Sequence, residues 1–107
     1  MKKSLLLAGI MALSFNATAE TAADLQNRSV GICIGAGEMA GISLNDDKLD
    51  NALDFADGEV ETAMSVAYGV GYANGAIETY KLNTLKDLPN RDIGKLVFET
   101  YECKKYI

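Results

Sequence analysis

Apolar side chains recur along most of this chain at the three- and four-residue steps of an amphipathic helix, and strand-like alternation is nearly absent. The first such pattern follows Thr21, a residue type that often caps a helix. The pattern predicts four helices: residues 21–42, a segment that begins at Asp46 or Asp47 and breaks or bends at Gly58, residues 59–80, and a last helix that starts at Pro89-Asn90. We therefore expect an all-α fold, a small bundle of about four helices.

The first nineteen residues have the three parts of a secretory signal peptide. Lys2 and Lys3 precede an almost wholly apolar run over residues 4–15, and small residues follow at positions 17–19. The run is too short to cross a bilayer, which needs about 20 residues. We expect a signal peptide over residues 1–19, export to the periplasm or medium, no membrane insertion of the mature chain, and a single helical domain over residues 20–107.

The mature chain has two cysteines, Cys33 and Cys103, one near each end. Outside the cytoplasm an even number of cysteines is normally oxidised, and two cysteines allow one intramolecular pairing. We predict that a Cys33–Cys103 disulfide closes the bundle. The alternative is a pair of free, buried thiols.

Acidic residues gather in the middle of the chain, where seven carboxylates and a single Lys lie between Asp46 and Glu61. Carboxylates four residues apart repel each other on a helix, so they do not serve helix stability. They suit either a solvated face that keeps the protein soluble or a docking face for a protein partner with a basic surface. Their spacing does not fit a calcium loop. If the helix continues past Gly58, five of them form one stripe, which we predict as the partner-binding face: Asp47, Asp50, Asp54, Asp57 and Glu61.

Net charge narrows the partners further. Without Lys2 and Lys3 the mature chain has eight basic and fifteen acidic residues, a net charge of −7. This balance argues against nucleic acid and anionic membrane surfaces as partners.

Six glycines occur in two groups with the spacing Gly-x-Gly-x-x-x-Gly, 34 residues apart. Glycine lowers helix stability by about 1 kcal/mol relative to Ala, so its repeated use inside helices needs a reason. A phosphate-binding loop is the sharper alternative, but neither group has the Gly-x-Gly-x-x-Gly spacing or follows a strand, and no nearby Lys follows the glycines as in a Walker loop. We predict close helix–helix packing at Gly35, Gly37, Gly41, Gly69, Gly71 and Gly75.

The chain contains no His, so the commonest general base and the usual partner of a Ser or Cys nucleophile are missing. Two thiolates do not complete a zinc site. The sequence therefore favours binding over catalysis, and we expect no cofactor and no metal.

The segment Gly71-Tyr72-Ala73-Asn74-Gly75-Ala76-Ile77-Glu78 resembles the Gly-Tyr-x-x-Gly-x-x-acidic segment of periplasmic immunity proteins that protect bacteria from type VI secretion amidase effectors. Those proteins are also small, exported, helical and disulfide-bonded, often with a Cys near the end of the chain. Their Cys two residues before Gly-Tyr is Gly69 in this chain. The resemblance implies a protein that binds and neutralises an effector.

Two functional hypotheses follow. The first is a periplasmic binding protein, an immunity or inhibitor protein that neutralises a secreted or cell-wall-acting effector by stoichiometric association. The second is a small structural or chaperone-like envelope protein that forms a homodimer or larger assembly through its glycine-rich helices.

Overall fold

Four α-helices and a closing 3₁₀ turn make up residues 20–107, the part of the chain that the computed structural model describes. The expected signal peptide lies outside these residues. No strand occurs between residues 20 and 107, so the predicted all-α fold is confirmed. The elements are α1 (Ala22–Ala40), α2 (Asp46–Ala52), α3 (Glu59–Asn83), α4 (Asn90–Thr100) and the 3₁₀ turn η2 (Cys103–Tyr106).

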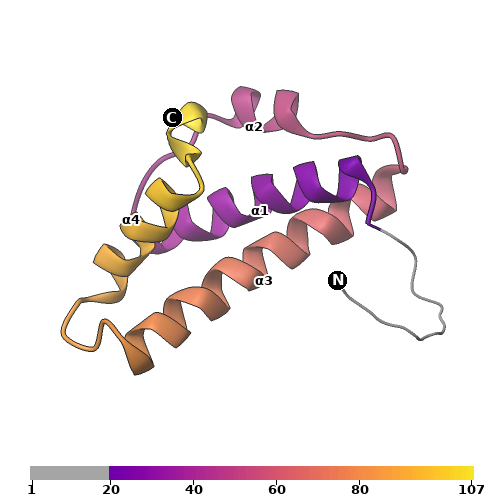
Figure 1. Cartoon of the computed structure of the whole chain (residues 1–107). Coiled ribbons are helices and arrows are strands. Elements are labelled where there is room, and N and C mark those ends of the chain that lie inside the picture. The colour runs from indigo at the N-terminus through magenta and orange to yellow at the C-terminus, as the bar shows by residue number, and fades with distance from the viewer. Residues whose placement is uncertain (1–19) are drawn as a thin grey trace, which may run out of the picture.

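The two longest helices, α1 and α3, lie side by side and run in the same direction (Figure 1). Because α1 and α3 are parallel, the chain must return from the end of α1 to the start of α3, which lies beside the start of α1. The segment that contains α2 makes this return along α1 (Figure 1). The last helix, α4, packs against the second half of α1, with Gly94 close to Ala36 and Ala40. The chain end then reaches α2, because the Asn45 N–H donates to the Tyr106 carbonyl at 2.7 Å.

Helix ends follow the local sequence closely. At the start of α1, the Thr21 hydroxyl accepts from the Asp24 N–H at 3.0 Å, and the Asp24 carboxylate accepts from the Thr21 N–H, which completes a capping box. The same helix ends at Gly41, whose φ of 72° lies in the left-handed region where glycine has no steric penalty. The Asn45 side chain caps α2 by accepting from the Lys48 N–H. The predicted Thr21 cap is therefore confirmed.

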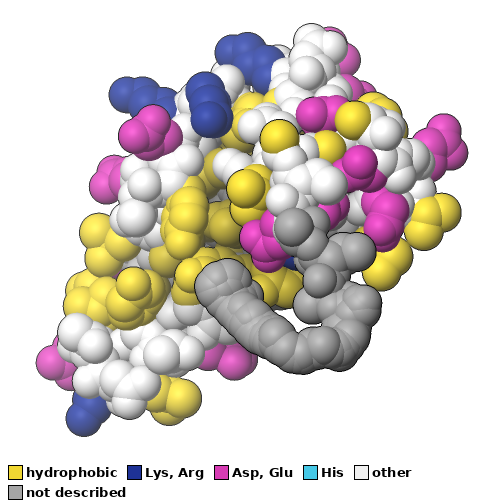
Figure 2. Space-filling model, turned by 45° about the vertical axis from the view of Figure 1, so that its right-hand side comes forward, with side chains coloured by type: hydrophobic (Ala, Val, Ile, Leu, Met, Phe, Trp, Pro, Cys, Tyr) yellow, Lys and Arg dark blue, Asp and Glu magenta, His cyan; other side chains and the backbone are white. Residues whose placement is uncertain are grey.

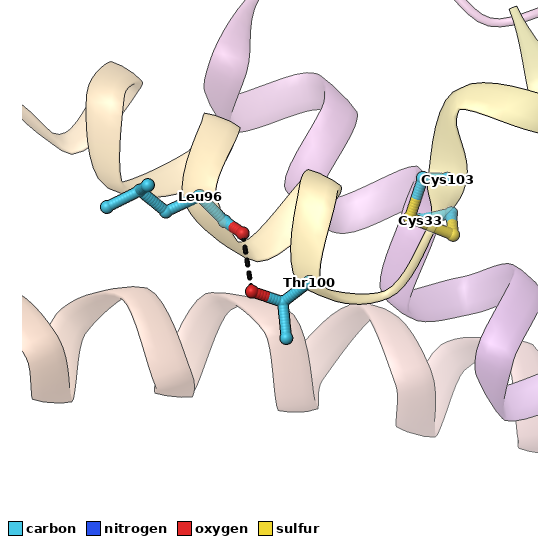
Figure 3. The surroundings of a disulfide bond; sticks show 4 residues. All are labelled: Cys33, Leu96, Thr100 and Cys103. Atoms are coloured by element: carbon cyan, nitrogen blue, oxygen red, sulfur yellow. Dashed lines mark hydrogen bonds between the residues drawn. A yellow bond between two sulfur atoms is a disulfide. The ribbon is translucent and has the colours of Figure 1, made fainter.

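The buried core lies where α1, α3 and α4 meet. It is closed by the Cys33–Cys103 disulfide, whose two Cα atoms are 5.3 Å apart, so the predicted bridge is confirmed. Figure 3 shows the bond joining α1 to the turn after α4, near Thr100, whose hydroxyl donates to the Leu96 carbonyl at 2.8 Å. Both cysteines are fully buried, so the bridge is also part of the core: Val30, Ile32, Cys33, Ala36, Ala73, Ile77, Ile93, Val97, Phe98, Cys103 and Tyr106.

Glycine allows the close approach of α1 and α3. A Cβ on Gly31 would lie 2.0 Å from the Val66 carbonyl oxygen, and one on Gly69 would lie 2.1 Å from the Arg28 carbonyl oxygen. A Cβ on Gly35 would lie 3.0 Å from the Ala73 Cβ. Packing at Gly35 and Gly69 agrees with the sequence prediction, whereas Gly31 lies outside the spacing pattern and was missed.

The other four predicted glycines do not lie between α1 and α3. Gly37 faces Leu44 and Phe98, and Gly41 is the residue that ends α1. For Gly71 and Gly75, a Cβ would meet nothing within 4 Å, and both residues are exposed. The prediction that these two pack within the chain is wrong, because the spacing identifies a helix face but not which face turns inward.

Candidate protein-binding surfaces

The predicted acidic stripe does not lie on one helix. The second helix, α2, ends at Ala52, and α3 begins only after Gly58, whose φ is 95°. Asp47 and Asp50 therefore belong to α2, Glu61 belongs to α3, and Asp54 and Asp57 lie in the segment between them. The condition for a continuous stripe, a helix that passes Gly58, is not met.

A buried side chain from α1 holds this connecting segment. The Asn27 amide donates to the Asp54 carbonyl and accepts from the Asp54 N–H, both at 2.8 Å, and Asn27 is only 1% exposed. The Thr62 hydroxyl also contacts the Asp54 carbonyl at 3.2 Å. These bonds satisfy backbone groups of Asp54 that a helix would otherwise satisfy, so the segment between α2 and α3 is not helical. Asn27 was missed by sequence reasoning, although a lone amide among the apolar positions of α1 is a detectable signal.

A second polar contact joins the start of α1 to the start of α3. The Thr21 hydroxyl donates to the Asp57 carboxylate, and the Ser65 hydroxyl donates to the Asp24 carboxylate at 2.9 Å. The bond from Ser65 is the main cause that lowers the pKa of Asp24 below its usual value of 3.8, and the Thr21 N–H and hydroxyl lower it further. Asp24 and Asp57 therefore support the fold.

The lowered pKa of Asp24 predicts a pH-dependent contribution to stability. A carboxyl whose pKa is lower in the folded chain than in the unfolded chain stabilises the fold above the unfolded pKa, and this contribution is lost as pH falls through the folded pKa. We expect Asp24→Asn to lower the urea midpoint at pH 7, with a difference from wild type that shrinks as the pH falls below the usual carboxyl pKa of 3.8. The exposed Asp87→Asn is the control. A difference that is constant across this pH range would contradict the role of the charge.

The remaining predicted acidic residues stay open to solvent. Asp47 and Asp50 on α2 and Glu61 on α3 are exposed, whereas Asp54 is half-buried. The acidic surface that is free for a partner therefore centres on α2, next to Asp46 at the start of the same helix.

A groove lined with tyrosines lies between α3 and α4, and we call it the tyrosine groove. It has a volume of about 110 Å³, and exposed aromatic and aliphatic side chains form its rim: Tyr72 (49% exposed), Tyr80 (48%), Leu96 (45%) and Tyr101 (36%). Figure 2 shows one face of the molecule, on which hydrophobic side chains gather to the left and centre and acidic ones most densely toward the upper right. Exposed large apolar side chains grouped in a concave site are typical of a protein-binding surface.

Two tyrosines of this groove contact each other. The Tyr72 and Tyr101 rings meet edge to face with centroids 6.4 Å apart, and the Tyr101 hydroxyl donates to the Tyr72 hydroxyl at 3.5 Å. This hydrogen bond, together with partial burial, raises the pKa of Tyr101 to about 12. Tyr101 is neutral at physiological pH, as an ordinary tyrosine is, so a partner meets an uncharged aromatic edge.

A larger, shallow hollow of about 590 Å³ lies beside α4 and the chain end. Its walls combine apolar residues such as Phe98 with charges of both signs, including Lys95, Glu99 and Lys104. The opposite charges leave no dominant sign with which to select a ligand.

The chain matches no family model, no curated protein and no solved structure. Over residues 20–107, no helix combines the length and the apolar character that spanning a bilayer requires. The same residues contain no group of three or more Cys, Asp or Glu side chains placed to hold a metal ion.

Proposed function

We propose that this chain is an exported binding protein that neutralises a secreted or cell-wall-acting effector by stoichiometric association. The observation that carries the proposal is the tyrosine groove, whose rim exposes three tyrosines and a leucine on a domain of fewer than ninety residues. Tyr is among the residue types that contribute most to binding at protein interfaces, and a concave apolar site is where such contacts are strongest.

The chemistry of the chain supports binding over catalysis. The sequence has no His, and both cysteines are joined in the buried disulfide, so neither supplies a thiolate nucleophile. The tyrosines of the groove offer hydrogen bonds and aromatic contacts, which are the means of recognition.

The acidic and aromatic surfaces have different parts in the proposed binding. Exposed carboxylates such as Asp47 and Asp50 act over several ångströms and speed the approach of a basic partner. The tyrosine groove acts only on contact and slows dissociation, because its apolar rim is removed from water when a partner fills it.

The proposal is tested by capture from periplasmic extract with the tagged protein, followed by titration of the captured protein's activity. We expect a complex of fixed stoichiometry in which that activity falls to zero at equivalence. Capture without inhibition, or inhibition without a fixed ratio, would contradict the proposal.

Variants then separate the two surfaces. We expect Asp47→Asn with Asp50→Asn to lower the association rate and its salt dependence, and Tyr101→Ala to raise the dissociation rate by about tenfold or more. Glu38→Gln with Glu99→Gln is the matched control, because it removes two exposed carboxylates outside the acidic surface. If the Asp47/Asp50 and Glu38/Glu99 double variants lower the association rate equally, net charge alone sets that rate and α2 is not a docking site.

A further inference from the structure

The lining of the tyrosine groove contains no charged side chain from residues 20–107. Three tyrosines stand around an aliphatic floor: Tyr72, Tyr80 and Tyr101. The basic residues that adjoin the lining in sequence are directed elsewhere. The Lys81 ammonium donates to the backbone carbonyls of residues 86 and 88 at 3.0 and 2.6 Å, and Lys95 lines the larger hollow beside the chain end. The groove is therefore a neutral, aromatic site.

We propose that the tyrosine groove takes a lysine side chain of the partner protein, with the ammonium among the three tyrosines and the aliphatic stem on the floor. This inference rests on the proposed function, in which the groove contacts a protein partner, and it names the group of that partner that enters.

Charge favours a cation as the occupant. Residues 20–107 contain eight basic and fifteen acidic side chains, a net charge of −7, so the molecule attracts cations and repels anions. A tyrosine ring attracts a cation to its face because the π-electrons make the face negative. The chain already pairs its own cations with tyrosines in this way. The Arg28 guanidinium lies 4.3 Å from the ring centroid of Tyr68, and the Lys105 ammonium lies 5.5 Å from that of Tyr106.

The arrangement of the rings favours Lys over Arg. The Tyr72 and Tyr101 rings are inclined at 85° with centroids 6.4 Å apart, so together they form a corner. A guanidinium is planar and stacks on one ring, whereas an ammonium is a compact charge with three donors and can contact two perpendicular walls. The phenol oxygens offer acceptors for these donors, including that of Tyr101, whose own proton is donated to Tyr72.

The size and the floor of the groove fit the rest of a lysine side chain. Its volume of about 110 Å³ corresponds to roughly four water molecules at about 30 Å³ each, which is room for one slender side chain. Ile93 and Val97 of α4 lie in the floor and offer an apolar surface to the four methylene groups of Lys. An aliphatic side chain would use this floor but would leave the phenol oxygens without a donor.

Titration of the disulfide-bonded protein with N-acetyl-lysine N-methylamide, followed through the tyrosine ring resonances by NMR, tests the inference. The matched ligand is N-acetyl-norleucine N-methylamide, which has the same aliphatic stem without the ammonium. We expect the lysine compound to shift the resonances of Tyr72 and Tyr101 with a Kd of about 1 mM, and the norleucine compound to bind at least about fivefold more weakly. Equal binding of the two compounds, or lysine-induced shifts confined to the acidic residues of α2, would overturn the proposal.

Tyr72→Leu distinguishes attraction to the aromatic rings from apolar burial. Leu keeps an apolar side chain at this exposed helix position and removes the ring and its hydroxyl. We expect about threefold or more weaker binding of the lysine compound, with binding of the norleucine compound unchanged. The matched control is Tyr68→Leu, which removes an exposed tyrosine of the same helix that does not line the groove. Equal losses of lysine binding in the two variants would refute the groove as the site.

The ligand titration and the capture experiment can fail separately. Binding of the lysine compound in the groove without an inhibited effector would contradict the proposed function and support the assignment of the groove. An effector that is fully inhibited by a protein whose groove does not prefer the lysine compound would overturn the assignment alone.

Discussion

Gly69→Ala should destabilise the protein by about 3 kcal/mol or more, a large part of the total stability of a small domain. A Cβ at this position would lie 2.1 Å from the Arg28 carbonyl oxygen and 2.8 Å from the Ile32 nitrogen. Both atoms belong to the backbone of α1, so no side chain can rotate away and the two helices must separate. Urea denaturation at low protein concentration measures the loss as a lower midpoint.

Gly71→Ala is the matched control on the same helix, two residues away. A methyl group there meets nothing within 4 Å, and Ala gains about 1 kcal/mol of helix propensity over Gly. We expect this variant to be more stable than wild type as a monomer. If Gly69→Ala is as stable as Gly71→Ala, α1 and α3 do not approach as closely as the structure shows.

Removal of the disulfide should have the other large effect. Its two cysteines are 70 residues apart, and closing a loop of this length stabilises a fold by about 4 kcal/mol on the chain-entropy model. For a domain of this size the melting temperature should fall by roughly 15 °C or more. Cys33→Ala with Cys103→Ala, followed by thermal denaturation, measures the effect.

Reduction of the wild-type protein distinguishes the stability that comes from the covalent bond from the stability that comes from the packing of the two cysteine side chains. Both sulfur-bearing residues are fully buried in the core, so the Ala variant also loses apolar contacts. The reduced protein keeps both side chains and loses only the bond. We expect it to lose most of the same stability, and an unchanged melting temperature would show that the bond contributes little.

The helices were predictable from the sequence because their ends have local signals. Thr21 with Asp24 forms a capping box within four residues, and Pro89-Asn90 opens α4. The disulfide was predictable because the mature chain has two cysteines and so one possible bridge. The helix ends depend only on neighbouring residues. The disulfide joins distant residues, but the sequence leaves one possible pair.

The prediction that the acidic residues form one helix face depended on a helix that continues past Gly58. The contact that holds the chain in a different path comes from a distant residue. The Asn27 side chain binds the backbone of Asp54, 27 residues later, and replaces the bonds that a continued helix would make. No local property of residues 53–58 encodes this partner. The sequence shows an amide at an apolar position of α1, but the burial of Asn27 to 1% exposure and the identity of its partner are known only from the fold.

The orientation of α3 was not predictable for a related reason. Its inner face uses Ala73 and Ile77, and its outer face uses Val60 and Met64, so both faces are apolar. Periodicity assigns the buried face of a helix only when the other face is polar. The glycines share this ambiguity: Gly69 packs against α1, and Gly71 points away from it.

The Cys33–Cys103 bond makes the chain between these residues a covalent ring that contains α2, α3 and α4. A protease that cuts one exposed peptide bond within the ring, for example in the segment around Phe55, opens a gap but releases no fragment. The nicked molecule keeps its mass apart from one added water, and both pieces stay next to each other to re-form their contacts. Two cuts within the ring are needed before any part of it is lost, which is a form of resistance to degradation that is separate from the folding free energy.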